Sequence, residues 1–504
     1  MSTLQYREVE AWPPLAWLAV CESAHDDVLV LHGTQVEAHP EWFCEAVWDG
    51  EFEEGGFDQN DRVYGSGGRL REGRLRFVSC GVTFDRLHHV VRGGRTFVSN
   101  SLACLATGTE LELDVTHPHY LKDFMSIKRG YRGCVRQIVT SEEPIELTYY
   151  DDLVWVDGRL EAEPKQREKA DLGSYDSYRR FMASALEGLF ANARSAARRH
   201  RYEPLVAISS GMDSGTAAAL SVPHGLREGF TFRTARRGKE DSGQSMAKAL
   251  GIEVETFERD DWHRYDLPEV PFLLGDARGP DVFYRSAENL IAGRLLLTGY
   301  TGGGLWTTRK RLSADTMPRV DTSGLSLAEY RLWVGALHLP VPAIGYAQMA
   351  EVEAISFQPE MERWRVPRSY DKPIARRVLV EAGVEPDSVA RYNRASTVLW
   401  VGESTFLSDA SREDFAGWLR RNEERLVQAH GGPPVADLPR GGPDVAVGRR
   451  LAEFARSAPG RQHGMKAIAR WLLRGADPTP LMRYFLPWAM EHGRRRYGSP
   501  DLSR

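Results

Sequence analysis

The sequence predicts an α/β fold with a mostly parallel sheet in its central part, preceded by an N-terminal α+β domain. Between residues 204 and 298, short apolar strands alternate with helical patterns, which is typical of a parallel sheet that helices cover on both faces. The first 160 residues instead show short apolar or alternating segments separated by glycine-rich turns. This second pattern favours β-structure at the N-terminus.

The length of the chain favours two or three domains. With 504 residues, the chain is too long for a single hydrophobic core. A polar, charged stretch from Glu161 to Leu172 has the composition of a linker, and Gly-Pro segments after residue 430 mark a looser connection. We therefore expect an N-terminal domain over residues 1–165, a central domain over 173–430 and a helical extension over 431–504.

The composition is that of an ordinary globular protein. Hydrophobic residues make up 42% and charged residues 27%, and the formal net charge of -5 is too mild to suggest a nucleic-acid-binding surface. No stretch of eighteen apolar residues occurs, and the apolar segment from Pro13 to Val20 has no basic segment before it. We expect a cytoplasmic protein with neither a nucleic acid nor a membrane as its partner.

The cysteines are few and widely spaced, with no CxxC pair among them. This pattern predicts buried, reduced thiols. A zinc site made mainly of thiolates needs closely spaced pairs, so the spacing argues against one. The five positions are Cys21, Cys44, Cys80, Cys104 and Cys134.

The central domain is predicted to begin with an amphipathic helix. Apolar residues from Tyr178 to Ala193 recur at steps of three and four, with arginines opposite. Strands are then predicted at 204–209, 230–232, 253–257 and 294–298, and helices at 212–221 and 245–250. Helical patterns dominate from Ser326 to Gln428.

One loop of this domain has the composition of an anion-binding site. The strand that ends at Ile208 leads into Ser209-Ser210-Gly211-Met212-Asp213-Ser214, and an alanine-rich helix follows. Small residues let backbone N–H groups approach an anion, and the helix directs its positive end toward it. Asp213 suits a Mg²⁺ ion that bridges phosphate oxygens. The alternative is a serine-rich helix cap, in which Asp213 and Ser214 only cap the helix.

This loop resembles the pyrophosphate loop of the N-type ATP pyrophosphatases, which usually reads Ser-Gly-Gly-x-Asp-Ser. Ser209, Gly211, Asp213 and Ser214 match, whereas Ser210 stands where glycine is usual. Within that superfamily the chain is similar to the asparagine synthetase-like enzymes, which include β-lactam synthetases and lasso-peptide cyclases. The resemblance implies a parallel-sheet ATP-pyrophosphatase domain with ATP and Mg²⁺ as cofactors, nucleotide binding by all six loop residues, and Asp213 as the metal ligand.

Three further stretches resemble the family in the expected order. Phe230-Thr231-Phe232-Arg233 matches the strand near adenine, which implies a nucleotide contact at Phe232. Leu297-Thr298-Gly299-Tyr300-Thr301-Gly302-Gly303 is similar to the strand and loop beside the substrate, which implies that Gly299 contacts the nucleotide. Tyr370 to Arg377, followed by Arg391 to Arg394, resembles the late Asp-Lys-x-x-x-Arg segment and implies nucleotide binding by Arg376.

The family's second metal-binding aspartate is absent from this sequence. Only glycines and Leu305 occupy its place. The family normally uses two Mg²⁺ ions to neutralise the triphosphate, and Asp276, Asp281 and Glu288 are nearby candidates to replace the missing ligand. A degenerate relic that binds a nucleotide or a partner without turnover is therefore the alternative to an active enzyme.

Lys372, Tyr300 and Glu288 are the candidate catalytic residues. A cation at Lys372, beside the α-phosphate, would stabilise the charge that develops as pyrophosphate leaves. The alternative is a surface lysine that pairs with Asp371 at the start of a helix. An amine substrate also needs a base, for which Tyr300, Glu288 and Tyr370 are unranked candidates.

The N-terminal domain resembles the Ntn-hydrolase-like glutaminase domain of asparagine synthetases without its nucleophile. Strand patterns between Val82 and Thr107 are similar, but Ser2 stands where the family has a cysteine. A serine nucleophile is conceivable, yet the arginine and glycine signature of a glutamine pocket is not evident. We expect a structural domain without glutaminase activity, as in β-lactam synthetases and lasso cyclases.

Together these features predict an ATP-dependent ligase that adenylates a carboxylate, releases pyrophosphate and transfers the acyl group to an amine, in specialised biosynthesis. Without a glutaminase, the amine is ammonia, a separate amine or a group of the same substrate. Small-molecule or peptide carboxylates and amines are the expected partners, and a homodimer is compatible with the sequence. Sulfur transfer or tRNA base modification is disfavoured, because such enzymes usually need reactive cysteines near the loop and none lies beyond Cys134.

Overall fold

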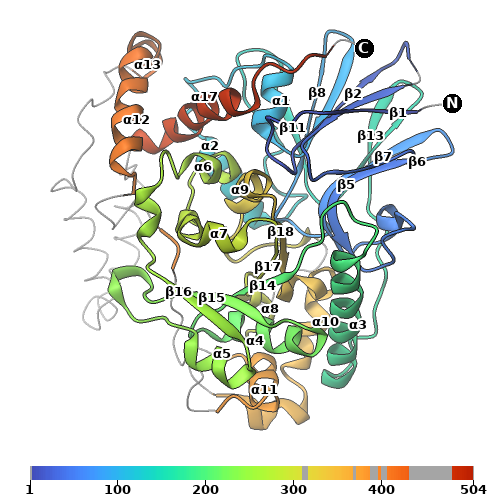
Figure 1. Cartoon of the computed structure of the whole chain (residues 1–504), viewed down its shortest axis with the longest axis vertical. Coiled ribbons are helices and arrows are strands. Elements are labelled where there is room, and N and C mark those ends of the chain that lie inside the picture. The colour runs from blue at the N-terminus through green and yellow to red at the C-terminus, as the bar shows by residue number, and fades with distance from the viewer. Residues whose placement is uncertain are drawn as a thin grey trace.

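The computed structural model describes residues 3–25, 27–308, 316–366, 371–385, 396–398, 406–430 and 480–502. In these ranges the chain forms three β-sheets with helices around them (Figure 1). None of the helices in these ranges combines the length and the apolar character that a membrane crossing requires.

Two sheets, largely antiparallel, form the N-terminal part. The seven-stranded sheet has the order β1-β3-β2-β9-β8-β11-β10, in which β1 and β3 are parallel. Its strands are β1 (Leu4–Glu8), β2 (Trp17–Glu22), β3 (Val28–His32), β8 (Leu87–Arg92), β9 (Arg95–Ser99), β10 (Gln137–Ile138) and β11 (Ile145–Thr148). The six-stranded sheet has the order β13-β12-β7-β6-β5-β4. Its strands are β4 (Glu37–His39), β5 (Trp42–Trp48), β6 (Val63–Arg71), β7 (Arg74–Val78), β12 (Asp152–Val156) and β13 (Arg159–Glu163).

An aromatic core joins these two sheets. Trp17 of β2, Phe43 of β5 and Phe77 of β7 are fully buried in one cluster, and the Trp17 ring stacks on Phe77 with centroids 6.1 Å apart. Rings of this size bury large apolar areas and dominate the energetics of a core. Helix α1 (Leu102–Gly108) packs on the seven-stranded sheet, and α3 (Tyr175–Arg194) packs on β5 of the other. The layers therefore follow the order helix, sheet, sheet, helix.

The central part contains a five-stranded parallel sheet with the order β16-β15-β14-β17-β18, so the predicted α/β class with a parallel sheet is confirmed. Its strands are β14 (Pro204–Ala207), β15 (Glu228–Phe232), β16 (Glu253–Phe257), β17 (Leu295–Thr298) and β18 (Leu337–Pro340). Figure 1 shows α4, α5 and α11 on one side of this sheet and α6, α7 and α9 on the other. The chain fills one half of the sheet from β14 outward and then returns to β17, so the strand order reverses beside β14.

The remaining helices are short, and most lie in the central part. They are α2 (Tyr120–Met125), α4 (Met212–Ser221), α5 (Gln244–Leu250), α6 (Val270–Asp276), α7 (Glu288–Ile291), α8 (Gly302–Leu305), α9 (Leu327–Val334), α10 (Met349–Ile355), α11 (Pro373–Glu381), α12 (Asp409–Arg421), α13 (Glu423–His430) and α17 (Phe485–Tyr497).

A buried ion triplet joins the N-terminal part to α9. The Arg331 guanidinium donates from Nε to Asp85 Oδ1 at 3.0 Å and also pairs with the carboxylate of Glu45. Buried ion pairs are tolerated when further hydrogen bonds satisfy them, and Ser66 donates to Glu45 at 2.6 Å. The triplet therefore links the two parts through buried polar contacts.

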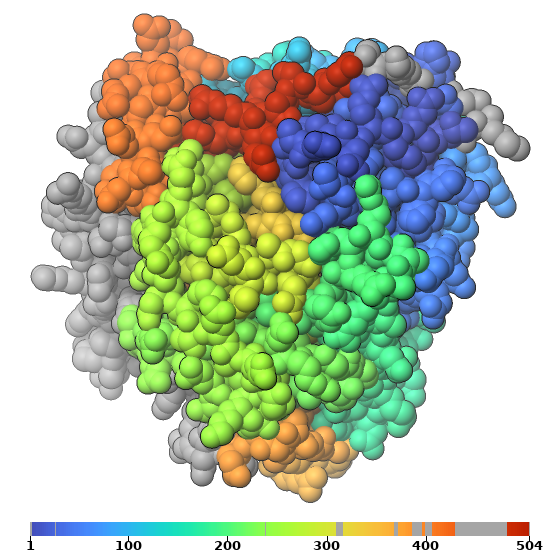
Figure 2. All heavy atoms as spheres, viewed as in Figure 1, coloured from blue at the N-terminus to red at the C-terminus, as the bar shows by residue number. Residues whose placement is uncertain are grey.

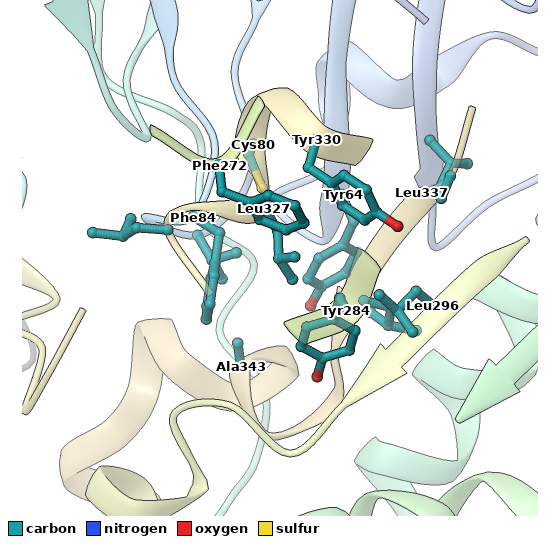
Figure 3. Close-up of a cluster of buried hydrophobic side chains, with 14 of the residues drawn as sticks. Tyr64, Cys80, Phe84, Phe272, Tyr284, Leu296, Leu327, Tyr330, Leu337 and Ala343 are labelled. Carbon is teal, nitrogen blue, oxygen red and sulfur yellow. The ribbon is translucent and has the colours of Figure 1, made fainter. Parts of the chain in front are cut away.

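An apolar cluster continues this interface (Figure 3). Tyr64, Cys80 and Phe84 of the N-terminal part lie near Phe272 and Tyr330, whose rings stack with centroids 4.3 Å apart. Phe84 also contacts Tyr300 and Arg319, which line the central cavity described below, so the N-terminal part packs behind the wall of that cavity.

Helix α17 lies across both parts near the end of the chain. Figure 2 shows it in red between the blue N-terminal strands and the orange helices α12 and α13. The Trp12 indole donates to the Tyr497 carbonyl at 2.7 Å, and the Tyr497 hydroxyl donates to Glu329 of α9 at 2.7 Å. Most of the predicted helical extension, residues 431–479, lies outside the described residues.

The prediction of helix from Ser326 to Gln428 needs one correction. Residues Leu337–Pro340 form β18, an edge strand of the parallel sheet. This segment is short and ends in a proline, so its sequence carries little strand pattern. Its strand state depends on pairing with β17, and His338 Nε2 lies 2.9 Å from Thr298 Oγ1 of that strand.

The predicted helix at 212–221 and the predicted strand at 253–257 are confirmed to the residue. The expectation of reduced thiols is also confirmed. None of the five cysteines belongs to a disulfide, four of them are buried, and Cys134 is half-buried.

Candidate functional site

The predicted loop lies where the strand order of the parallel sheet reverses. It follows the carboxyl end of β14, between the ends of β15 and β17. In open α/β sheets this position forms a crevice that commonly receives ligands. The fold therefore places residues 209–214 at the most favourable point of the sheet for a binding site.

Hydrogen bonds within the loop shape it into a turn before α4. The Ser214 hydroxyl accepts from the Ser209 backbone N–H at 3.0 Å, and the Ser209 hydroxyl accepts from the Gly211 N–H at 3.1 Å. Gly211 is the N-cap of α4 and no side chain caps this helix. The alternative of a simple serine or aspartate cap is therefore wrong for Asp213.

Asp213 in the first turn of α4 meets Lys372 at the start of α11. The Lys372 ammonium donates to both carboxylate oxygens of Asp213 at 2.6 Å. Lys372 is 3% exposed, and the Asp213 side chain is 24% exposed. The alternative of a surface lysine paired with Asp371 is therefore also wrong, since Lys372 is buried and directed at the loop.

Glycines of the turn after β17 enclose this pair. A Cβ at Gly299 would meet the backbone of Asp213 at 2.4 Å, and a Cβ at Gly302 would meet Asp213 Oδ1 at 2.8 Å. Only glycine fits at such separations without displacing the carboxylate or the helix start. A Cβ at Gly303 would lie at an ordinary 3.9 Å from Lys372 Nζ. The glycine-rich turn thus leaves room for Asp213 beside the cavity.

A cavity of about 230 Å³ opens beside the loop. That volume is far more than single waters need and suits a small-molecule ligand. Its wall includes Ser209, Gly211, Asp213 and Ser214 of the loop and Gly299 of the turn. The rest of its wall includes four aromatic residues, Phe230, Phe232, Phe283 and Tyr284, together with Tyr300, Arg319, Asp321 and Tyr346.

The aromatic part of the wall is formed by rings from two segments. Phe232 at the end of β15 meets Phe283 edge to face, with centroids 5.1 Å apart, and Tyr284 with centroids 6.2 Å apart. Phe232 lines the cavity, and its contact with a nucleotide stays a prediction. Such a wall can pack the face of a planar, apolar ring system.

Tyr300 is placed in the cavity wall together with a buried carboxylate. Its hydroxyl donates to Asp281 Oδ1 at 2.7 Å, and Asp281 also accepts from Ser326 at 2.6 Å and from the Gly324 N–H at 2.9 Å. Burial raises the pKa of Asp281 and, together with that carboxylate, raises the pKa of Tyr300. At neutral pH Tyr300 is therefore a protonated hydroxyl beside a carboxyl that accepts protons more readily than an exposed aspartate.

The three proposed substitutes for the missing metal ligand do not line the cavity. Asp276 accepts from two backbone N–H groups, and its burial raises its pKa to about 6. Asp281 is satisfied by the bonds just described, and Glu288 pairs with Arg285. In the described part of the chain, no cluster of three or more His, Cys, Asp or Glu residues could hold a metal ion by itself.

Two other carboxylates, Asp241 and Asp321, do line the cavity. Asp241 is buried and accepts from the hydroxyl of Ser210 at 2.6 Å. Asp321 is exposed, and its Oδ1 accepts from the backbone N–H of Ser323 at 3.0 Å. Ser210 therefore links the loop to Asp241.

The structure does not bring every predicted site residue to the cavity. Glu288 is held by Arg285, and burial raises the pKa of Glu288. Arg376 donates to the Trp364 carbonyl and lies 3.5 Å from Asp371. Met212 is fully buried, and neither Ser210 nor Lys372 is among the residues that line the cavity. Tyr370, the third candidate base, lies outside the described residues, as does the segment 391–394.

Arg319, Asp321, Phe283 and Tyr346 line the cavity but were not singled out from the sequence. The segment that contains Arg319 has no motif, and arginine is common in this chain. Arg319 lies in a stretch with neither helical nor strand periodicity, where a charged residue is ordinarily exposed. The local sequence therefore predicts exposure of Arg319 and not its burial in a cavity wall.

Comparisons with known proteins leave the family open. No protein-family model matches the chain, and no curated protein matches it. Among solved structures, it is similar to a predicted subunit of a tRNA methyltransferase from Methanocaldococcus jannaschii. That match has 15% identity, covers 39% of this chain and 96% of the other, and has a TM-score of 0.17. A TM-score this low carries no argument about fold or function.

Proposed function

We propose that the cavity binds ATP with Mg²⁺ and that the protein is an ATP-dependent ligase, which adenylates a substrate carboxylate and transfers the acyl group to an amine. The contact between Lys372 and Asp213 carries this proposal. It sets a buried cation and a partly exposed carboxylate side by side at the N-terminus of a ten-residue helix, next to a glycine-containing loop. Such a combination suits a polyanion and its metal ion.

The donor set fits one Mg²⁺ ion with a triphosphate. Mg²⁺ in nucleotide sites is usually held by one or two carboxylates, phosphate oxygens and water, and Asp213 supplies a carboxylate at the cavity wall. A bound Mg²⁺ ion would neutralise part of the negative charge of the phosphates. Asp241 is a second carboxylate in the cavity wall, and its hydrogen bond with Ser210 holds it beside the loop.

The residues of this chain have separate roles in the proposed reaction. The start of α4 binds the phosphates, and Phe232 and Phe283 pack the base. Lys372 stabilises the negative charge that develops as pyrophosphate leaves, because a buried cation acts more strongly than an exposed one. Most of the acceleration would come from positioning and charge neutralisation.

Tyr300 with Asp281 is the proposed proton acceptor for the attacking amine. As the amine forms its bond to the acyl carbon, the acyl–oxygen bond to the adenylate breaks and AMP leaves with the electron pair. The amine proton passes to the Tyr300 oxygen while the Tyr300 proton passes to Asp281 along their 2.7 Å hydrogen bond. Glu288 is not proposed for this role, because Arg285 holds its carboxylate away from the cavity wall.

In this proposal the N-terminal part, with its layered sheets and helices, has a structural role. It supplies Phe84 next to Tyr300, with ring centroids 6.4 Å apart. Ser2, at the position of the family's nucleophile, lies outside the described residues. The amine is then ammonia or a substrate amine, and glutamine is not expected to replace it.

The test is release of pyrophosphate from ATP and Mg²⁺ with pools of carboxylates and amines, for the wild type and Asp213→Asn. We expect release that depends on a carboxylate and that falls strongly in the variant. ATP binding is measured separately by titration calorimetry. Ammonia, supplied amines and glutamine are compared as acyl acceptors, and turnover with glutamine alone would contradict the absence of glutaminase activity.

A nucleotide-binding relic is the second candidate, and one observation favours it. Leu305 and Trp306, which follow the glycine turn where the family has its second metal ligand, are both buried and apolar. ATP binding without pyrophosphate release across all pools would support this alternative. The absence of ATP binding would contradict both candidates.

A further inference from the structure

Cationic side chains gather on the surface around Tyr131, in the N-terminal part. The Tyr131 carbonyl accepts from Arg136 Nη2 at 3.1 Å, and its hydroxyl accepts from Arg167 Nη2 at 3.2 Å. Arg132 Cζ lies 5.4 Å from the centroid of the same ring. Four members of this group are exposed and Arg136 is half-buried. The group, called the basic surface below, consists of Lys128, Arg129, Arg132, Arg136 and Arg167.

The basic surface has no carboxylate partners in the part of the chain that the structure describes. None of its five cations forms an ion pair there. Exposed arginines elsewhere do find partners, as Arg92 does with Glu142 and Glu143. The chain has more acidic than basic residues, 70 against 65, so carboxylates are not scarce. Unpaired like charges repel one another, and a bound anion would relieve that repulsion.

One carboxylate near the basic surface, Asp151, does not neutralise it. Burial raises the pKa of Asp151, and the charges of Arg136 and Arg132 act against this rise. Asp151 is half-buried and forms no ion pair with either arginine. The basic surface therefore keeps a net positive charge of several units.

Most guanidinium donors of the basic surface remain available. Each guanidinium has five N–H groups in a planar fork. Among the described residues, Arg136 uses one of them for Tyr131, and Arg167 uses two, for the hydroxyls of Tyr131 and Tyr150. The side chains of Arg129 and Arg132 make no hydrogen bond with a described residue. Such forks bind carboxylates in a bidentate manner, so the surface suits several carboxylates spaced along a chain.

The basic surface adjoins the segment that leads into the cavity wall. The Tyr131 N–H donates to the Thr316 carbonyl at 2.9 Å. A Cβ at Gly130 would lie 2.1 Å from the same carbonyl, so glycine is required for this contact. Arg319 lines the cavity only three positions after Thr316, a span of at most about 10 Å. A molecule bound at the basic surface therefore lies beside the cavity wall.

We propose that the basic surface binds an acidic segment of a partner protein. This binding needs neither ATP nor Mg²⁺, so the inference goes beyond the proposed ligase and stands or falls independently of it. Glutamate and aspartate side chains along such a segment supply the spaced carboxylates that the arginines can pair with.

Nucleic acids and membranes fit the basic surface less well. Tyr131 and Tyr150, the rings beneath the arginines, are each 1% exposed and offer no face on which a base could stack. A long polyanion would also meet the net negative charge of the whole chain, -5. A membrane surface usually requires apolar anchors beside the cations. The exposed large apolar side chains that the structure describes belong to other segments: Val91, Phe357, Val366 and Val427.

Fluorescence anisotropy with short labelled peptides tests this inference on the full chain. The probe is octaglutamate, and octaglutamine is its uncharged match. We expect octaglutamate to bind and octaglutamine not to bind. The affinity should fall between roughly 10 mM and roughly 150 mM salt, because exposed charges are then screened more strongly.

The variant Lys128→Glu/Arg129→Glu/Arg132→Glu replaces three attractive charges with repulsive ones. These side chains make no hydrogen bond with a described residue, so we expect the melting temperature to stay near that of the wild type. Octaglutamate should bind at least about tenfold more weakly. If the melting temperature falls, Arg129→Gln/Arg132→Gln takes the place of this variant and should still weaken binding severalfold.

The variant Arg180→Glu/Arg201→Glu/Lys248→Glu is the matched control. These three cations are also exposed, and none forms an ion pair with a described residue. They lie in other segments, and their replacement changes the net charge of the chain by the same amount. We expect octaglutamate to bind this variant as tightly as it binds the wild type.

Several outcomes would overturn the inference. Equal affinity for octaglutamate and octaglutamine, or a preference that survives in the variant of the basic surface, would exclude this surface as the binding site. An equal loss in the control variant would show that only the net charge matters. Tighter binding of a thymidine octanucleotide or of phosphatidylserine vesicles, dependent on the same residues, would assign the surface to those partners instead. Self-association that disappears in the variant of the basic surface would assign it to a second copy of the chain.

Discussion

The hydroxyl of Tyr300 donates a hydrogen bond to Asp281 at 2.7 Å, and Asp281 is itself wholly buried. Tyr300 lines the cavity and Asp281 lies behind it. A proton that arrives at the tyrosine oxygen can therefore leave the cavity without passing through solvent. This arrangement makes the pair a better proton acceptor than either residue alone, because the raised pKa of Asp281 favours protonation of its carboxyl.

Tyr300→Phe should reduce turnover while ATP binding stays intact. Removal of a positioned acid–base group typically lowers the rate by about 10²- to 10⁴-fold. In the wild type, turnover should rise with pH as Asp281 loses its proton, at a pH above the usual range of aspartate because burial raises its pKa. The measurement is the pH profile of kcat. In Tyr300→Phe this rise should disappear.

Tyr346→Phe is the matched control for that variant. Tyr346 also lines the cavity, but its hydroxyl donates to the Pro318 carbonyl at 2.7 Å and, among the residues that the structure describes, contacts no carboxylate. We expect its pH profile to keep the wild-type shape. Similar losses and similar profiles in both variants would contradict the special role of the pair formed by Tyr300 and Asp281.

Asp213→Asn should destabilise the fold more than Lys372→Met. The first change removes a charged partner of the Lys372 ammonium, which is 3% exposed. The second leaves Asp213, whose side chain is 24% exposed and can be hydrated. We expect about 1–3 kcal/mol for Asp213→Asn and about 0–1 kcal/mol for Lys372→Met, measured by urea unfolding. Equal costs, or the reverse order, would show that burial does not decide this interaction.

The loop and its helix could be predicted because their determinants are local. Small residues, hydroxyls and alanines over ten or so positions suffice to predict an anion-binding turn before α4. The contact between Lys372 and Asp213 spans 159 positions, so only a family resemblance suggested it. Neither residue carries a local signal of the other.

The residues that the sequence misplaced or missed depend on tertiary neighbours. Glu288 was a reasonable candidate base, but Arg285, three positions earlier on the same turn, holds its carboxylate. Arg319 was missed because its burial depends on the Thr83 carbonyl, 236 positions away, and on the ring of Phe84. Periodicity and composition contain no information about such contacts.

Gly302→Ala should weaken ATP binding more than Gly303→Ala. A Cβ at Gly302 would lie 2.8 Å from Asp213 Oδ1, so the carboxylate must move away from its position at the cavity. A Cβ at Gly303 would lie 3.7 Å from the other oxygen, which is ordinary contact. Both substitutions alter the same short helix α8, so the comparison cancels its change in helix propensity.

The measurement for these two variants is the dissociation constant of ATP with Mg²⁺. We expect a loss of roughly tenfold for Gly302→Ala, equivalent to about 1.4 kcal/mol, and a smaller loss for Gly303→Ala. If both variants bound ATP as the wild type does, the position of Asp213 would not matter for the nucleotide.

The stability of the protein should fall as pH rises through the range in which Glu269 ionises in the unfolded chain but not in the folded one. Burial raises the pKa of Glu269 from 4.5 to about 7, and its carboxyl oxygens meet the Ser408 N–H and the Ser411 hydroxyl. Between these two values the folded state retains a proton that the unfolded state releases, so rising pH favours unfolding. With 1.36 kcal/mol per pKa unit, the loss amounts to about 3 kcal/mol at most.

Glu269→Gln should remove this part of the pH dependence. A glutamine amide has the shape of a protonated glutamate, so its oxygen can accept from the Ser408 N–H while its NH₂ donates to Ser411. We therefore expect the variant to match the wild type near pH 4.5 and to exceed its unfolding free energy at pH 8, as measured by urea unfolding at both values. If the variant lost the same unfolding free energy at both pH values, Glu269 would be ionised in the folded protein throughout this range. In that case the substitution would remove the same charge-assisted hydrogen bonds at each pH.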